Sequence, residues 1–219
     1  MNLRRLSWVV SAVFMLALAA SAQKGKLEIS PAVGWETSGS FPVVNTTNPN
    51  IDQLRLDSSL SYGASIDYSV TQSLALEALW VRNQSTYSQH DFTTGFYSPV
   101  FDSNVDQVEF GVLYELRRGG LYGDENKLQP FIAGGLGFTH EDNSQGTPNR
   151  TSFAFNLGGG VKYYVSKHFG LRGDIRYMPT YANTTNALAC SPFFGDCFVV
   201  RQHNFQQRGN FSGGIILRF

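Results

Sequence analysis

The sequence of 219 residues has little charge and few cysteines or histidines, and these shortages exclude several classes of protein. Charged residues make up only 16% of the chain, and 17 basic residues are balanced by 17 acidic ones, which excludes a polybasic nucleic-acid binder. The two cysteines and four histidines follow no zinc-binding spacing. Because hydrophobic residues reach 42% and aromatic residues 14%, intrinsic disorder is excluded as well.

A long hydrophobic run is also missing beyond the first segment of the chain. No later stretch reaches eighteen uncharged apolar residues, so we expect no transmembrane helix in the mature protein. What the chain does contain is glycine (22), phenylalanine (17) and tyrosine (10). This composition is typical of glycine- and aromatic-rich β structure, and the length favours a single domain.

The first 22 residues have the three parts of a cleavable signal peptide. Arg4 and Arg5 form a positive head, residues 8–20 form an apolar run too short to span a bilayer, and residues 20–22 supply a small-x-small cleavage site. We therefore predict a signal peptide over 1–22 and a mature domain over 23–219. Cleavage removes two arginines and no acid, so the mature chain carries a formal charge of −2. A buried N-terminal helix is the alternative.

Beyond the signal, the hydrophobic pattern has a period of two residues, which is typical of β-strands. The longest run, 54–68, alternates almost without interruption and exceeds the usual strand length in globular proteins. Eight segments alternate in this way: 27–36, 54–68, 74–80, 107–116, 128–139, 152–165, 169–177 and 210–219. Eight is the smallest strand number of bacterial membrane barrels. Pro31 and Pro179 each lose a ladder hydrogen bond, so we expect a bulge or a strand end near each.

The connections between these segments differ in length in a regular way. The odd-numbered ones are long, at 37–53, 83–104, 140–151 and 180–206, whereas the even-numbered ones, 69–73, 117–127 and 166–168, are shorter. Outer-membrane barrels have short periplasmic turns and long extracellular loops. The lengths therefore favour a transmembrane barrel over a soluble sandwich and assign the four long loops to the outside of the cell.

Two further features resemble a known family. The last segment closes with Ile215, Leu217 and Phe219, which resembles the sorting signal that the outer-membrane barrel assembly machinery reads. Segments 128–138 and 169–177 look like the fifth and seventh strands of small outer-membrane β-barrels, a group that includes the OmpA transmembrane domain, OmpX and OmpW types and porin-family β-barrel domains. The resemblance covers residues 24–219.

The resemblance implies an all-β fold, an eight-stranded antiparallel up-and-down transmembrane β-barrel. It places the protein in the cell outer membrane of a Gram-negative-type bacterium, as a monomer in contact with outer-membrane lipids and the assembly machinery. Aromatic residues toward the segment ends are the expected interfacial girdles. These residues are Trp35, Tyr62, Tyr68, Trp80, Tyr114, Tyr163 and Tyr177.

The inward face of such a barrel would carry many charges. Its predicted ion-pair residues are Glu28, Asp67, Glu77, Glu109, Glu115, Lys162, Arg172, Asp174, Arg176 and Arg218. Unpaired charges in a barrel interior are costly, so acids on the first four segments must meet bases on the last three. We predict a cross-lumen ion-pair network that plugs the barrel, with a gate or proton path as the alternative.

The last long loop contains both cysteines of the chain. Cys190 and Cys197 bracket six residues that include Pro192 and Gly195, and both cysteines pass through the oxidising periplasm. We predict a disulfide between them, in a loop that stands apart from the hydrogen-bonded wall. Phe193 and Phe194 between them form either a contact surface for an extracellular ligand or local packing over the barrel mouth.

No catalytic or metal site is evident from the sequence. Lipid A-modifying barrels of the deacylase type need a His-x-Ser, and no histidine here has serine two residues on. Residues 102–106 begin like a calcium loop, but Gln107 replaces the glycine that such a loop needs. We therefore expect no enzyme activity and no cofactor.

Several functions remain open at this point. We favour an integral outer-membrane barrel with a structural or surface-interaction role through its extracellular loops. The alternatives are a narrow porin-like passive channel for small solutes, a lipid A-modifying enzyme and a secreted lipocalin-like carrier. The carrier would need a G-x-W motif on its first strand, but Gly34 and Trp35 are adjacent.

Overall fold

The computed structural model describes residues 25–45, 50–116, 127–143, 149–182, 189–190, 197–200 and 204–219. The predicted signal peptide lies outside these residues. Within them, no helix has the length and apolar character needed to cross a membrane.

The described chain is all β, as predicted. Its strands are β1 (Leu27–Ser38), β2 (Ser40–Asn45), β3 (Ile51–Leu56), β4 (Ser59–Ser69), β5 (Leu74–Asp91), β6 (Tyr97–Glu115), β7 (Leu128–Asn143), β8 (Arg150–Tyr164), β9 (Phe169–Tyr177), β10 (Thr180–Ala182), β11 (Ala189–Cys190), β12 (Cys197–Val200), β13 (Asn204–Gln206) and β14 (Arg208–Arg218).

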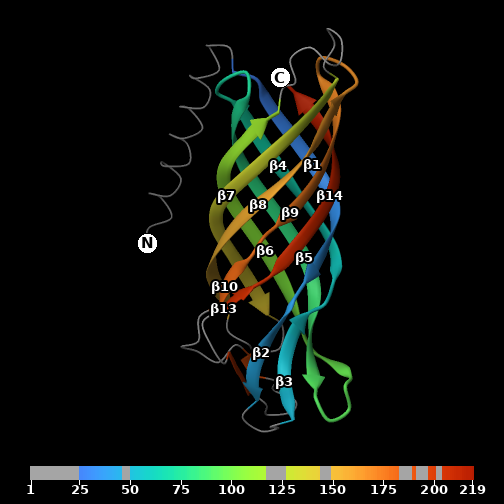
Figure 1. Ribbon diagram of the computed structural model, residues 1–219, viewed down its shortest axis with the longest axis vertical. Helices are drawn as coiled ribbons and strands as arrows, with labels where there is room; N and C mark the ends of the chain where they lie inside the picture. The colour runs from blue at the N-terminus through green and yellow to red at the C-terminus, as the bar shows by residue number, and fades with distance from the viewer. Residues whose placement is uncertain are drawn as a thin grey trace.

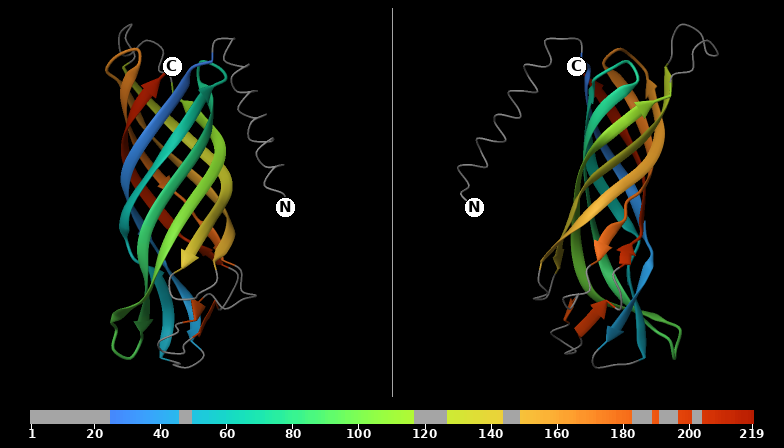
Figure 2. Two further views of the ribbon diagram at one scale, coloured as in Figure 1. Left: turned by 180° about the vertical axis from the view of Figure 1, so that it is seen from behind. Right: turned by 60° about the vertical axis from the view of Figure 1, so that its left-hand side comes forward.

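Eight of these strands close into a ring, which Figures 1 and 2 show as a tilted barrel. Around the ring the order is β1, β4, β5, β6, β7, β8, β9, β14 and back to β1, and every neighbouring pair is antiparallel. The ring closes where Leu27 and Phe219 exchange backbone hydrogen bonds of 3.3 and 2.9 Å. The predicted eight-stranded antiparallel barrel is therefore confirmed.

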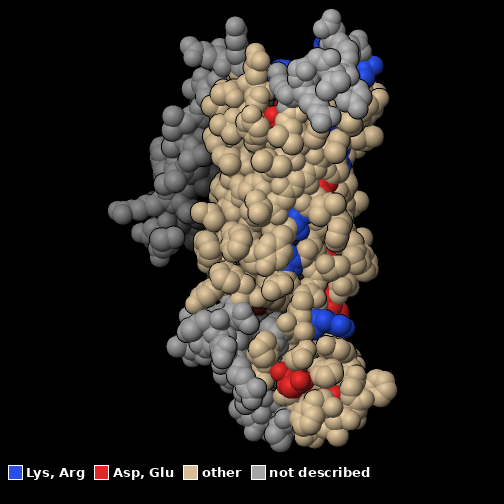
Figure 3. All heavy atoms as spheres, viewed as in Figure 1, with Lys and Arg blue, Asp and Glu red and all other residues tan. Residues whose placement is uncertain are grey.

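The barrel wall is apolar outside and polar inside. Leu60, Phe110 and Leu157 on the outer face are 63%, 64% and 65% exposed, whereas Glu28 and Lys162 on the inner face are 2% and 1% exposed. Figure 3 shows a visible wall that is mostly uncharged, with some basic atoms near its middle height and both acids and bases at the end where β2 and β3 lie. A wall of this polarity suits hydrocarbon outside and a polar lumen inside.

The aromatic residues on the outer face form two groups at opposite ends of the wall. Tyr62 and Trp80 pack edge to face, with ring centroids 6.1 Å apart, toward one end. Tyr68, Tyr114 and Tyr163 stand beside the other end, opposite Leu27, Leu74 and Leu128 in the strand pairing. This is the arrangement expected of two interfacial girdles.

Glycine lets the wall curve tightly between β6 and β7. A Cβ added to Gly137 would lie 2.0 Å from the backbone oxygen of Val108, and one added to Gly111 would lie 2.1 Å from that of Gly134. Gly111 stands directly opposite Gly135 in the pairing. A side chain at these inward positions would push the two strands apart.

The first two long connections are mostly strand, which corrects their predicted loop boundaries. β5 continues to Asp91 and β6 begins at Tyr97, so most of 83–104 is a paired ribbon. β2 and β3 fill much of 37–53. We call β2, β3, residues 83–91 and residues 97–105 the extension; it projects beyond the closed ring (Figure 1). Outside hydrocarbon a ribbon needs no apolar outer face, so the alternation that predicts wall strands is lost there.

The predicted continuous strand 54–68 is wrong as well. The chain leaves strand geometry between β3 and β4, at residues 57 and 58. Leu54 and Leu56 before this break are 0% and 1% exposed, but Leu60 after it is 63% exposed. The break turns the chain, so leucines of the same sequence parity lie on opposite faces.

The two prolines behave differently. β9 ends at Tyr177 and β10 begins at Thr180, so a strand end lies at Pro179 as predicted. Pro31 instead lies within β1, opposite Ala64 of β4, and its register with β4 continues without a shift. The expected bulge at Pro31 is therefore absent.

Candidate functional site

Three long basic side chains cross the barrel lumen. Lys162 extends from β8, and Arg172 and Arg176 extend from β9, toward acids on β1, β4 and β5. β5 and β9 are four strands apart in either direction around the ring, so a contact between them spans the full width of the lumen. These bonds brace opposite walls against each other.

Lys162 joins three strands at one end of the lumen. Its Nζ lies 2.8 Å from Glu28 Oε2, 2.9 Å from Asp67 Oδ2 and 3.5 Å from Glu115 Oε1. Glu28 also accepts a hydrogen bond of 2.6 Å from Arg218 Nε. This single buried ammonium therefore connects β8 with β1, β4 and β6.

Arg172 uses its whole guanidinium group in the next layer of the lumen. Nη1 lies 2.7 Å from Asp67 Oδ2, Nη2 lies 2.6 Å from Glu77 Oε1 and Nε lies 2.6 Å from Asp174 Oδ2. Glu77 also binds both terminal nitrogens of Arg176 at 2.8 Å. The acids are shared between the bases, so the cluster is one network rather than a set of separate pairs.

Most predicted ion-pair residues meet in this network, but Glu109 does not. Its carboxylate accepts hydrogen bonds from the amides of Gln107, at 2.9 Å, and Asn156 instead. Arg176 reaches the same region by donating to Asn156 Oδ1 at 3.2 Å. Glu109 is 1% exposed, so amide hydrogen bonds satisfy this buried carboxylate in place of an ion pair.

Glu36 and Arg208 form a second buried ion pair, which was not predicted from the sequence. Arg208 Nε lies 2.5 Å from Glu36 Oε1, and Asn83 Nδ2 donates to the same oxygen at 3.0 Å. Arg208 Nη1 also donates to Gln107 Oε1 at 3.1 Å. Both residues keep the inward parity of their strands, so extending the last segment from Asn210 back to Arg208 would have found the pair.

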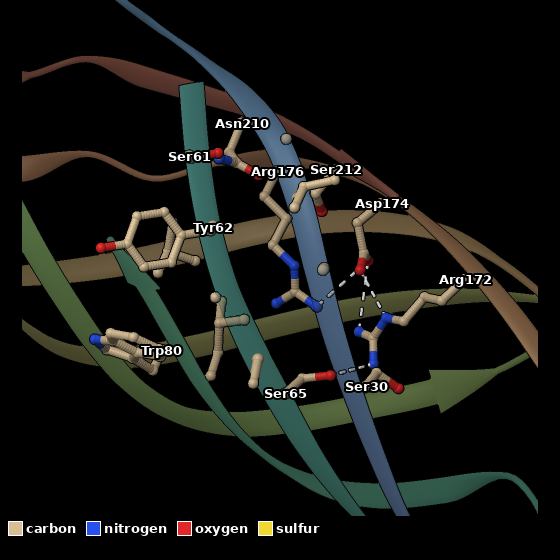
Figure 4. Close-up of a pocket in the computed structure, with 17 residues that line it drawn as sticks. Ser30, Ser61, Tyr62, Ser65, Trp80, Arg172, Asp174, Arg176, Asn210 and Ser212 are labelled. Carbon is tan, nitrogen blue, oxygen red and sulfur yellow. Dashed lines mark hydrogen bonds and ion pairs between the residues drawn. The ribbon is translucent and has the colours of Figure 1, made fainter. Parts of the chain in front are cut away.

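One small cavity lies beside the basic residues of the lumen. A cavity of about 30 Å³ lies between the serines of β1 and β4 and the basic residues of β9. Figure 4 shows Arg172 and Arg176 reaching across it. Since one water needs roughly 10–15 Å³, this cavity holds about two water molecules. The Ser30 hydroxyl at its edge has no partner among the described residues, so such a water would satisfy it.

The extension has an apolar core of its own. The buried members of this cluster are Val43, Ile51, Leu54, Leu56, Tyr87, Phe101 and Val105. Tyr87 and Phe101 lie across β5 and β6 with ring centroids 4.8 Å apart, and each side chain is less than 5% exposed. The cluster holds β2, β3, β5 and β6 together beyond the ring.

The last long connection is joined to the extension, which corrects the expectation that it stands apart. β12 pairs with β2, with Val199 opposite Val44. Cys190 stands directly opposite Cys197 where β11 pairs with β12. Phe193 and Phe194 lie outside the described residues. The disulfide stays a prediction, but the backbone register brings its two cysteines face to face.

Other predicted site residues occupy the outer face. Ile215, Leu217 and Phe219 point away from the lumen and are 40%, 37% and 71% exposed. Their position suits the outer wall, and their role as a sorting signal stays a prediction.

Three histidines are described, and none of them contacts both a hydroxyl and a carboxylate in this part of the chain. His90 Nδ1 lies 2.7 Å from Asp52, and His168 Nδ1 donates to a backbone oxygen. His140 Nδ1 lies 2.9 Å from Thr151 Oγ1. Asp106 is opposite His140 in the strand pairing, but its carboxylate binds Trp80 Nε1 at 3.1 Å instead. The described residues also contain no cluster of three potential metal ligands.

Comparison with known proteins agrees with this architecture. Residues 9–206 match the model of the outer membrane protein beta-barrel domain. None of the curated protein sequences compared with the chain matches it.

Several solved structures share the fold. Neisserial surface protein A is 14% identical, with 90% of this chain and 100% of that chain covered and a TM-score of 0.55. The outer membrane protein OprG from Pseudomonas aeruginosa is 13% identical, with 89% and 96% covered and a TM-score of 0.64. At such low identity the likeness concerns the fold alone.

Proposed function

We propose that this chain, which belongs to the outer membrane protein beta-barrel domain family, is a closed barrel that contacts partners outside the cell through its extension. The protein is located in the outer membrane, and the proposal concerns its role there. The observation that carries the proposal is the contrast between a filled lumen and an ordered projection beyond the wall.

The filled lumen argues against passive transport of solutes. Arg172 and Arg176 lie across the barrel from β9 to Glu77 on β5, and each is at most 4% exposed. A solute would have to break several buried ion pairs at once, at a cost of several kcal/mol. The cavity of about 30 Å³ beside Arg172 and Arg176 is too small for a solute larger than water.

The extension supports a contact role. A barrel that only had to span the membrane could end its strands at the girdle marked by Trp80. Instead β5 continues to Asp91, and a buried apolar cluster stabilises the projecting ribbons. Binding to a preorganised surface loses little conformational entropy, so such a projection is suited to recognition.

We also propose that the protein is not an enzyme. A surface hydrolase would need a nucleophile, a base and an orienting acid in mutual contact. Among the described residues, His140 contacts the Thr151 hydroxyl but has no orienting acid, because the Asp106 carboxylate binds Trp80 and Arg82.

Two measurements on the folded protein test the proposal. In planar bilayers, we expect no stable single-channel conductance, with insertion confirmed by heat-modifiable migration on gels. Bacteria that display the protein should attach to surfaces or to other cells better than bacteria displaying a variant in which an Asn-Gly turn replaces residues 84–104. Stable conductance by the unmodified protein would instead establish the narrow channel.

A further inference from the structure

The tip of the β5–β6 ribbon exposes three aromatic side chains. The turn runs from Phe92 to Phe96 and contains no charged residue, Asp91 ends the strand before it, and Tyr97 begins the strand after it. Phe92 is 59% exposed, Phe96 74% and Tyr97 39%. Exposed aromatic residues at the end of a projection mark a contact surface.

Every backbone amide of residues 91–96 donates to an acceptor within the protein. Asp91 Oδ1 accepts from the amides of Thr93 and Thr94, at 2.8 and 3.3 Å, and the Asp91 carbonyl accepts from Gly95 at 2.7 Å. The remaining three bonds join Asp91 N to Phe96 O (3.1 Å), Phe92 N to Asn50 O (3.1 Å) and Phe96 N to Thr94 Oγ1 (3.5 Å).

This complete pairing has a physical consequence for the surroundings that the tip can enter. Water would satisfy these amides in an ordinary exposed loop, so internal partners are unnecessary there. In an apolar environment each unpaired amide would cost several kcal/mol. The tip can therefore leave water without an orphaned N–H group, and Gly95, with φ of +71°, allows the tight turn that makes this possible.

The side chains behind the tip are arranged like those of a membrane interface. The Arg55 guanidinium lies 4.1 Å from the Tyr97 ring centre, and the His90 ring lies tilted against the same ring, with the two ring centres 4.9 Å apart. Arg55 and His90 are in turn paired with Asp57 and Asp52. Phenylalanine outermost, then tyrosine, then paired charges matches the order of acyl chain, interface and headgroup.

We propose that Phe92 and Phe96 insert into a zwitterionic phospholipid bilayer that faces the outer membrane. The inference rests on the proposed contact role of the extension and names its partner. Residues 81–91 carry β5 roughly 36 Å past Trp80, at about 3.3 Å per residue, so the tip stands away from the bilayer that holds the barrel. Because Asp52, Asp57 and Asp91 outnumber Arg55, an anionic bilayer would repel this region.

Flotation with lipid vesicles tests the inference. The complete barrel in nanodiscs is mixed with phosphatidylcholine vesicles, or with vesicles that also contain phosphatidylglycerol, and centrifuged through a density gradient. We expect flotation with the first vesicles and less with the second. The double variant Phe92→Ser/Phe96→Ser should bind about tenfold more weakly for each phenylalanine lost, since burying one is worth at least about 1.4 kcal/mol.

Matched variants separate insertion from general effects on folding. Thr93→Ser changes the same turn but no aromatic side chain, and Phe92→Leu/Phe96→Leu keeps the tip apolar, so both should bind like the unmodified protein. For Phe96→Trp, brominated lipid in the vesicles should quench fluorescence beyond the background that Trp35 and Trp80 give in the unmodified barrel.

The outcomes distinguish this inference from the proposed function. If the unmodified protein does not float, or the serine variant floats equally well, insertion is wrong, whereas a closed and adhesive barrel is compatible with either result. If the serine variant loses cell attachment while vesicles bind neither protein, the partner is an apolar protein pocket, which also overturns the inference. Stable conductance would count against the proposed function itself.

Discussion

Arg176 on β9 and Glu77 on β5 form a bidentate ion pair across the full width of the barrel. Nη1 and Nη2 of the arginine each lie 2.8 Å from a different oxygen of the carboxylate. Two parallel hydrogen bonds fix orientation as well as distance. The pair therefore holds opposite walls at a set separation while it fills the lumen.

Replacing Arg176 with alanine should destabilise the barrel by roughly 3–5 kcal/mol, the usual cost of breaking a buried pair. Glu77 would keep only its contact with Arg172. Equilibrium unfolding in urea, followed by tryptophan fluorescence, measures the change. The double variant Arg176→Met/Glu77→Leu should recover only part of the loss, because it leaves no carboxylate unpaired but takes Glu77 away from Arg172. Equal stability of the single variant and the unmodified protein would show that this bond contributes nothing.

Glycine positions in the wall should differ sharply in their tolerance of alanine. Gly137→Ala should prevent or strongly impair folding, since the new Cβ would lie 2.0 Å from the Val108 backbone oxygen. Gly173→Ala should fold normally, because no atom lies within 4 Å of its added Cβ. Heat-modifiable migration after refolding into detergent reports both results. Similar folding yields for the two variants would contradict this account of the wall.

The barrel wall could be predicted from the sequence because each of its residues meets one of two contrasting environments. Phe110 faces outward and Glu109 faces the lumen, so polarity alternates along β6 as the strand requires. The same alternation predicted which acids and bases face the lumen, but not which of them pair with each other. It could not show that Glu109 binds amides, since that depends on how Gln107 and Asn156 are placed around it.

The extension could not be predicted in the same way. Its ribbons leave the bilayer, so the outer face needs no apolar residues, and its inner face packs on other ribbons rather than on a polar lumen. Arg55 and Leu56 thus still alternate in polarity, but here the apolar residue faces the core of the extension rather than lipid. The tip at Phe92 and Phe96 depends on a turn whose backbone amides donate hydrogen bonds to Asp91 and to Asn50, which lies before β3. The contact between the turn and Asn50 joins residues far apart in the sequence, so no local sequence pattern predicts it.

Truncating Leu54 should therefore loosen the extension but leave the wall intact. Leu54 is 0% exposed in the apolar cluster, so Leu54→Ala should cost about 2–5 kcal/mol locally. Leu60→Ala removes the same atoms from a side chain that is 63% exposed on the outer wall, and it should change little. Amide hydrogen exchange should accelerate in β3 and in residues 83–91 of the first variant only. Equal effects of the two substitutions would mean that the two leucines share a face after all.

Reducing the predicted Cys190–Cys197 disulfide should loosen β12 and β2 without opening the barrel. The two cysteines are opposite each other in the β11–β12 pairing, and Val199 of β12 pairs with Val44 of β2. The disulfide would close only a short loop of the chain, so its stabilisation should be near the lower end of the roughly 2–4 kcal/mol typical of disulfides. Hydrogen exchange of the oxidised and reduced proteins should differ in β2 and β12. The β9–β14 ladder, where Ile175 pairs with Phe211, provides the internal control and should not change.

A membrane-impermeant maleimide should label intact cells only after reduction. Labelling before reduction would rule out the bond, and unchanged exchange in β2 would show that the loop does not support the extension.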